Sequence, residues 1–93
     1  MSHGTESTEA ILEQAIGKRV CLQAVYNRVP VVLAPHSLIT QHDAAYLRAV
    51  TVEHGGRKPR EPKLGAFKVD GLTGVGLTKR LFSPKSIFEK LEA

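Results

Sequence analysis

The chain has 93 residues, of which 42% are hydrophobic and 24% are charged. These proportions indicate one globular domain and exclude a disordered chain. The formal net charge is +4, but residues 1–16 carry three acidic and no basic residues. Residues 17–93 therefore carry +7, from thirteen basic and six acidic residues, which suits a phosphate-bearing or acidic partner. The alternative is surface charge that serves only solubility.

The single cysteine excludes an intramolecular disulfide bond. Residues 1–9 do not resemble a signal peptide, and no apolar run is long enough to cross a bilayer. We therefore expect a cytoplasmic protein with no membrane partner. Cys21 lies in an apolar alternating segment, which indicates a buried and unreactive thiol.

Two elements are expected before the first strand: a flexible N-terminus, residues 1–7, and a helix from Thr8 to Ile16. Thr8 can cap this helix, and the apolar residues recur at helical spacing. Gly17 is expected to end the helix, because glycine readily adopts the left-handed conformation that often follows helices. Residues 8–93, the helix included, are expected to form a single domain.

Two strands are expected next, Val20 to Tyr26 and Val29 to Leu33. Both faces of the first strand are mostly apolar, which suits a strand inside a small closed barrel. Pro30 implies that the second strand is an edge strand or begins close to this residue, because proline cannot donate a ladder hydrogen bond. Pro35 is expected to end regular pairing.

A polar turn, Gln41 to Asp43, predicts a β-hairpin whose returning strand, Tyr46 to Glu53, has the clearest strand pattern. Side chains two residues apart share one face of a strand. Tyr46 and Arg48 are therefore expected on one face, and Leu47 on the other.

The second half of the chain predicts a turn, a basic loop punctuated by prolines, two strands and a final short helix. In chain order these are His54–Gly56, Arg57–Lys63, Phe67–Leu72, Leu72–Leu81 and a helix that starts at Ser83-Pro84. The whole order predicts a mainly β fold with α: a small, strongly bent barrel of five strands with an N-terminal helix and a short C-terminal helix.

The order and spacing of several motifs resemble the WYL domain family. Ala45-Tyr46-Leu47 is similar to the Trp-Tyr-Leu run after which the family is named, with alanine in place of tryptophan. Residues 67–72 resemble its late strand, usually Phe-x-Leu-Asp-Arg-Ile, with Gly71 in place of the arginine. The resemblance covers about residues 10–83, and further matches are Tyr26, Pro35, Leu38, Ala49 and Phe82.

The resemblance implies an Sm-like barrel and a role in bacterial transcription regulation. WYL domains are thought to sense nucleic acid or nucleotide-like ligands and to mediate dimerisation, usually behind a winged helix-turn-helix. The sixteen residues before Gly17 are too few for that module, so a stand-alone WYL-like domain is expected. The changes at Ala45 and Gly71 would make it a degenerate one.

Tyr46 and Arg48 are the first candidates for a binding surface, because a phenol and a guanidinium on one face can stack a base and contact a phosphate. The alternative is that Tyr46 fills the barrel and Arg48 extends along its rim. His36 and Ser37 lie at the proline kink and can hydrogen-bond a ligand. Their alternative role is a capped turn.

A cluster of basic residues forms the second candidate site. The cluster can line a groove for a phosphate backbone, with affinity that falls steeply as salt rises. The alternative is a solvated loop. Its members are Arg57, Lys58, Arg60 and Lys63, joined by Lys68.

No catalytic constellation, metal-ligand spacing or cofactor motif is recognisable, so an enzyme, a metal and a cofactor are not expected. The leading hypothesis is a regulatory module that senses a nucleic-acid or nucleotide-like ligand, as a homodimer or with a regulator protein. The alternative is a protein–protein interaction or oligomerisation module without a small ligand.

Overall fold

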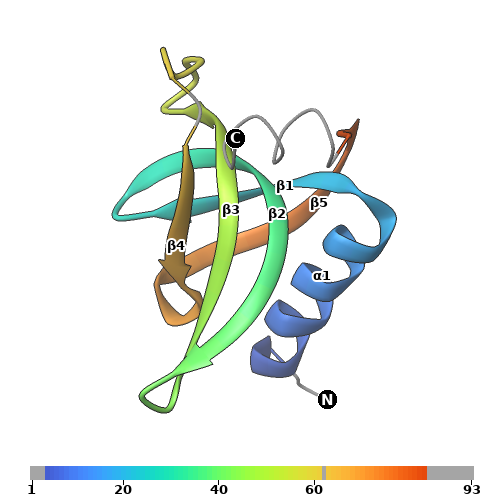
Figure 1. Ribbon diagram of the computed structural model, residues 1–93, viewed down its shortest axis with the longest axis vertical. Coiled ribbons are helices and arrows are strands. Elements are labelled where there is room, and N and C mark those ends of the chain that lie inside the picture. The colour runs from blue at the N-terminus through green and yellow to red at the C-terminus, as the bar shows by residue number, and fades with distance from the viewer. Residues whose placement is uncertain (1–3, 62, 84–93) are drawn as a thin grey trace.

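The computed structural model describes residues 4–61 and 63–83, and these residues form one helix, five strands and a single-turn 3-10 helix (Figure 1). The elements are α1 (Gly4–Lys18), β1 (Val20–Tyr26), β2 (Val29–Gln41), β3 (Ala44–His54), β4 (Leu64–Lys68), η1 (Val69–Gly71) and β5 (Leu72–Leu81). The C-terminal helix expected after Ser83 lies outside the described residues.

All five strands belong to one antiparallel sheet in the order β4-β3-β2-β1-β5. The predicted mainly β fold with an N-terminal helix is therefore confirmed. The sheet is strongly curved (Figure 1), but β4 and β5 remain its two edges, so the sheet does not close into a barrel.

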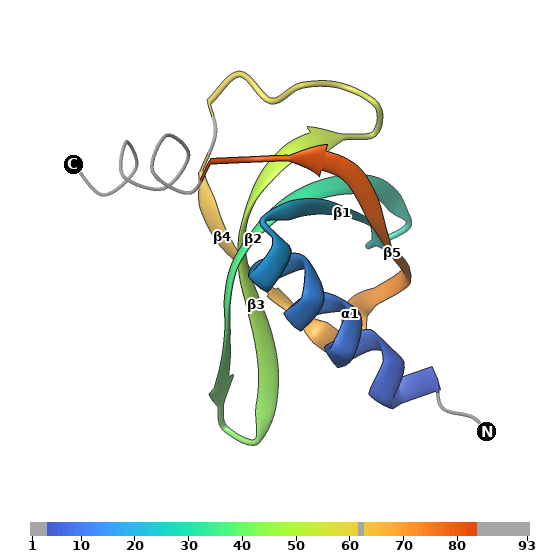
Figure 2. The same ribbon diagram turned by 90° about the vertical axis from the view of Figure 1, so that its right-hand side faces the viewer.

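The main core lies between the curved sheet and α1, which packs against β1, β2 and β5 (Figure 2). Leu22, Leu33 and Leu47 from three adjacent strands are fully buried there, together with Leu12 of α1. Burying one such side chain contributes about 1.5–3 kcal/mol. Aliphatic packing therefore decides which face of each strand points inward.

α1 is longer than predicted at both ends, since it begins at Gly4 and ends at Lys18. The expectation that Gly17 ends it is wrong. The left-handed conformation after the helix belongs to Arg19, with φ of 59°, whose N–H donates to the carbonyl of Ile16 at 3.3 Å. The chain continues directly into β1, so the position of that strand, and not the local glycine, determines where the helix ends.

β2 extends well past Pro35, and the expectation that pairing ends there is also wrong. Pro35 is buried and lies opposite Ala49 of β3. The register shifts between Pro35 and Ser37, which makes His36 the extra residue of a β-bulge. The bulge accommodates the proline without ending the strand, and β2 continues to Gln41.

β2 is an interior strand, between β1 and β3, so the edge position considered for it is wrong. Pro30 lies at the start of the strand, one residue before the pairing with β3 begins at Val31. The start-of-strand alternative therefore holds, and the sheet edges are β4 and β5 instead.

The two hairpin turns use left-handed backbone at residues other than glycine. Asn27 and Arg28 have φ of 52° and 67°, and His42 and Asp43 have φ of 50° and 63°. Two consecutive left-handed residues are typical of the turns that match the twist of antiparallel strands. The predicted turn after Gln41 is therefore confirmed.

The late strand is shorter and earlier than predicted. β4 ends at Lys68, and η1 replaces the expected strand residues 69–71. Val69 is buried at this corner, which leads the chain from one edge of the sheet to the other. β5 covers the predicted range Leu72–Leu81.

Candidate functional site

β3 presents Tyr46 and Arg48 on one face and buries Leu47 and Ala49 on the other, as predicted. Leu47 and Ala49 are both 0% exposed, whereas Tyr46 and Arg48 are half-buried. The bulge nearest to this segment lies on β2, so the alternation from Tyr46 to Ala49 is undisturbed. Tyr46 belongs to neither core cluster, and the alternative that it fills the interior is wrong.

The sheet register identifies the cross-strand neighbours of Tyr46 and Arg48. Tyr46 lies between Ile39 of β2 and Lys68 of β4. Arg48 lies between Ser37 of β2 and Ala66 of β4. Directly paired residues share one face, with Cβ atoms about 4.5–5.5 Å apart. We call this surface the binding face; it consists of Ser37, Ile39, Tyr46, Arg48, Ala66 and Lys68.

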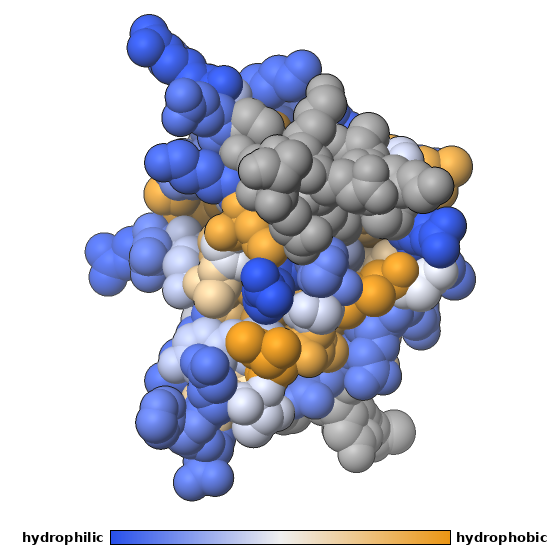
Figure 3. Space-filling view, viewed as in Figure 1, coloured by the Kyte–Doolittle hydropathy of each residue, from blue (hydrophilic) through white to orange (hydrophobic). Residues whose placement is uncertain are grey.

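The binding face combines one aromatic ring, two cations and a hydroxyl. Lys68 is exposed, and Ile39 is half-buried beside Tyr46. In the space-filling view, apolar and hydrophilic residues lie side by side over β2 and β3 (Figure 3). Such a surface can hold a flat ring by stacking and a phosphate by charge. Sequence reasoning missed Ile39, because only the register reveals that it neighbours Tyr46.

His36 and Ser37 are neighbours of this surface at the β2 bulge. The Ser37 hydroxyl and His36 Nδ1 are hydrogen-bonded at 3.2 Å, and both residues are half-buried. The register aligns Ser37 with Arg48. The bulge thus places Ser37 beside Arg48 in the sheet, with its hydroxyl bonded to His36.

The binding face ends two residues beyond Arg48. Val50 is only 2% exposed and belongs to a second, smaller core cluster with Cys21 and Ala34. Partly buried residues that pack against this cluster include Leu64 and Phe82. This apolar cluster marks the end of the polar surface along β3.

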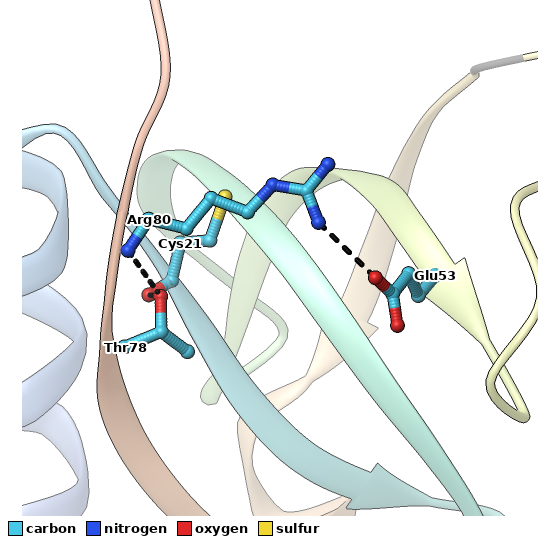
Figure 4. A network of polar contacts seen from close by, with 4 residues as sticks. All are labelled: Cys21, Glu53, Thr78 and Arg80. Atoms are coloured by element: carbon cyan, nitrogen blue, oxygen red, sulfur yellow. Dashed lines mark hydrogen bonds and ion pairs between the residues drawn. The ribbon is translucent and has the colours of Figure 1, made fainter.

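A network of polar contacts lies beside the second cluster (Figure 4). The Thr78 hydroxyl donates to the Cys21 carbonyl at 2.7 Å and accepts the backbone N–H of Arg80 at 3.1 Å. The Arg80 guanidinium then reaches Glu53 of β3 at 3.1 Å. Because both side chains of the ion pair are about half exposed, 49% and 41%, it contributes no more than about 1 kcal/mol.

Cys21 has the buried environment that the sequence predicts. Burial raises the pKa of the Cys21 thiol, the nearby Arg80 lowers it in part, and Glu53 raises it. With 1% of the residue exposed, the thiol is protonated at neutral pH and shielded from reagents.

The basic loop forms a separate feature at the end of β3. Arg57, Lys58 and Lys63 line a hollow of about 430 Å³. Its other lining residues are Thr51, His54, Pro59 and Glu61. Arg60 and Lys68 are not among its lining residues, and the groove expected for the whole cluster stays a prediction. Thr51 and His54 were missed, although the Gly55-Gly56 turn signal could have placed His54 beside Arg57.

Gly71 lies against an aromatic pair. A Cβ atom at Gly71 would come within 3.0 Å of Tyr26 Cε1. Tyr26 in turn packs edge-on against Phe67, with ring centroids 5.2 Å apart. A larger residue at position 71 therefore requires the Tyr26 ring to move.

Within residues 4–61 and 63–83, no cluster of three or more His, Cys, Asp or Glu side chains is arranged to hold a metal ion. In the same part of the chain, no helix is both long and apolar enough to cross a membrane. No family model matches the sequence, and no curated protein matches it.

Proposed function

We propose that this protein is a non-enzymatic sensing module of the WYL type that binds a nucleic-acid or nucleotide-like ligand at the binding face. We also propose that the open, curved sheet is related to the Sm-like fold. The protein would act in the cytoplasm, in transcription regulation. The motif resemblance at Ala45-Tyr46-Leu47 supports the family assignment. The net charge of +7 on residues 17–93 supports an anionic ligand.

The observation that carries the proposal is the placement of Tyr46 beside two cations. Lys68 lies directly opposite it across the β3–β4 pair, and Arg48 follows two residues later on the same face. Stacking of a base on an aromatic side chain contributes about 1–3 kcal/mol. The two cations can then contact phosphates adjacent to the stacked base.

Fluorescence anisotropy with short single-stranded DNA and RNA, together with competition by cyclic nucleotides at low salt, tests the proposal. We expect Tyr46→Ala to weaken binding by about 1–3 kcal/mol and Arg48→Ala to weaken it and reduce its salt dependence. Lys79→Ala is the charge-matched control, because Lys79 is exposed on β5, at the opposite sheet edge from β4. Absence of binding by every probe at low salt refutes the proposal.

The two open sheet edges favour a second candidate, an interaction module that pairs through β4 or β5. Unpaired edge strands can add a strand from another chain. Two large apolar residues of β5 are exposed, Leu77 at 38% and Leu81 at 72%. Light scattering over a range of protein concentrations tests this candidate for self-association, and a strict monomer argues against it.

A further inference from the structure

The hollow beside the basic loop shares no lining residue with the binding face. Thr51, the lining residue of β3 nearest to that face, lies three residues after Arg48, about 10 Å along an extended strand, and the buried Val50 lies between them. The loop that follows β3 and the tip of the β2–β3 hairpin lie at opposite ends of the molecule in both ribbon views (Figures 1 and 2). The hollow is therefore a distinct feature and not an extension of that face.

The rim of the hollow is held by a closed turn. His54 N–H donates to the Arg57 carbonyl at 2.8 Å, and Arg57 N–H donates to the His54 carbonyl at 3.1 Å. Gly55 and Gly56 adopt φ of 60° and 82° between them. Gly55 N–H also donates to the Pro30 carbonyl at 2.8 Å, which attaches the turn to β2. These bonds fix the backbone of Arg57 before any ligand arrives, which reduces the entropy lost on binding.

The charge of the hollow is positive and not internally neutralised. Arg57, Lys58 and Lys63 oppose one carboxylate, Glu61, which leaves a net charge of +2 with His54 neutral. Among the residues that the structure describes, the one ion pair is Arg80–Glu53. Hydrophilic side chains also gather over the loop at the top of the space-filling view (Figure 3). The three cations are thus available to a ligand.

We propose that this hollow binds a phosphate group, as a second site that does not depend on the proposed function of the binding face. Arginine offers a planar fork of donors that matches phosphate oxygens, and lysine adds a point charge. The Thr51 hydroxyl is a further donor on the lining. No Phe, Tyr or Trp lines the hollow, so its cations are the main groups for recognition.

Backbone amide NMR of the full chain, titrated with sodium pyrophosphate at constant ionic strength, is the direct test. We expect chemical-shift changes that cluster at residues 51–63 and leave Tyr46 and Lys68 unchanged. The double variant Arg57→Ala/Lys63→Ala is expected to weaken pyrophosphate binding about tenfold or more. The control Lys18→Ala/Lys79→Ala removes the same charge at exposed positions elsewhere and is expected to change affinity less than twofold, a rough bound for distant screened charges.

One further variant and one further ligand titration extend the test. Glu61→Gln removes the carboxylate from the hollow and is expected to tighten pyrophosphate binding. Titration with a short single-stranded oligonucleotide, with and without a 5′-phosphate, distinguishes a terminal phosphate from a phosphodiester backbone. Perturbation of residues 51–63 only by the phosphorylated form identifies a terminal phosphate, and equal perturbation by both forms identifies the backbone. Perturbation by pyrophosphate alone identifies a free phosphate compound.

The inference is overturned if both double variants weaken pyrophosphate binding equally, because net charge then explains the effect. Shift changes confined to the binding face, or no binding at low ionic strength, also overturn it. Tyr46→Ala separates the two proposals: it is expected to weaken nucleotide binding while pyrophosphate binding at the hollow persists.

Discussion

Replacing Gly17 by alanine tests how α1 ends. The helix runs through Gly17 to Lys18, and a Cβ atom at Gly17 meets no other atom within 4 Å. Alanine is favoured over glycine in a helix by about 0.5–1 kcal/mol. We therefore expect Gly17→Ala to raise the free energy of unfolding by that amount. For a domain of this size the corresponding rise in Tm is about 2–8 °C.

Gly56→Ala is the matched control for this substitution. A Cβ atom at Gly56 also meets no other atom within 4 Å, but its φ is +82°. The two variants thus differ in backbone conformation and not in available space. We expect Gly56→Ala to lower the free energy of unfolding by about 1 kcal/mol.

Urea denaturation followed by circular dichroism measures both variants at one pH and temperature. If Gly17 instead occupied the left-handed position that the sequence indicated, Gly17→Ala would destabilise the protein, as is expected for Gly56→Ala. A fall in stability for Gly17→Ala would therefore refute the helix boundary and the assignment of the left-handed position to Arg19.

Three further predictions concern the core, a turn and the buried thiol. Leu47→Ala is expected to lower the free energy of unfolding by about 2–5 kcal/mol, because Leu47 is 0% exposed; a loss under 1 kcal/mol in urea denaturation would contradict its place in the core. Arg28→Gly is expected to raise Tm, because Arg28 has φ of 67° and glycine adopts this conformation without strain; an unchanged or lower Tm would contradict the turn geometry. Burial raises the pKa of Cys21 above its ordinary value, so the folded state holds this proton more tightly than the unfolded state. The stabilisation is complete below the unfolded pKa and is lost as pH rises through the folded pKa, so urea denaturation between about pH 8 and 10 should show a steeper decline for wild type than for Cys21→Ala. Parallel declines would contradict the burial.

Local patterns in the sequence correctly predicted most strands and the composition of one face. Alternation along β3 predicted that Tyr46 and Arg48 lie opposite Leu47, because successive side chains of an extended chain point to opposite sides. The polar residues after Gln41 likewise predicted the hairpin turn. Both are short-range properties of the backbone, so neighbouring residues are sufficient to specify them.

Only the tertiary structure decided which strands are neighbours and where each element ends. The position of β1 ends α1 at Lys18 despite Gly17, and pairing with β3 carries β2 past Pro35 by means of a bulge at His36. The sheet register brings Lys68 beside Tyr46, and the loop places Arg57 and Lys63 around a hollow that excludes Arg60. These features depend on contacts between residues far apart in the chain, which periodicity and local propensity do not encode.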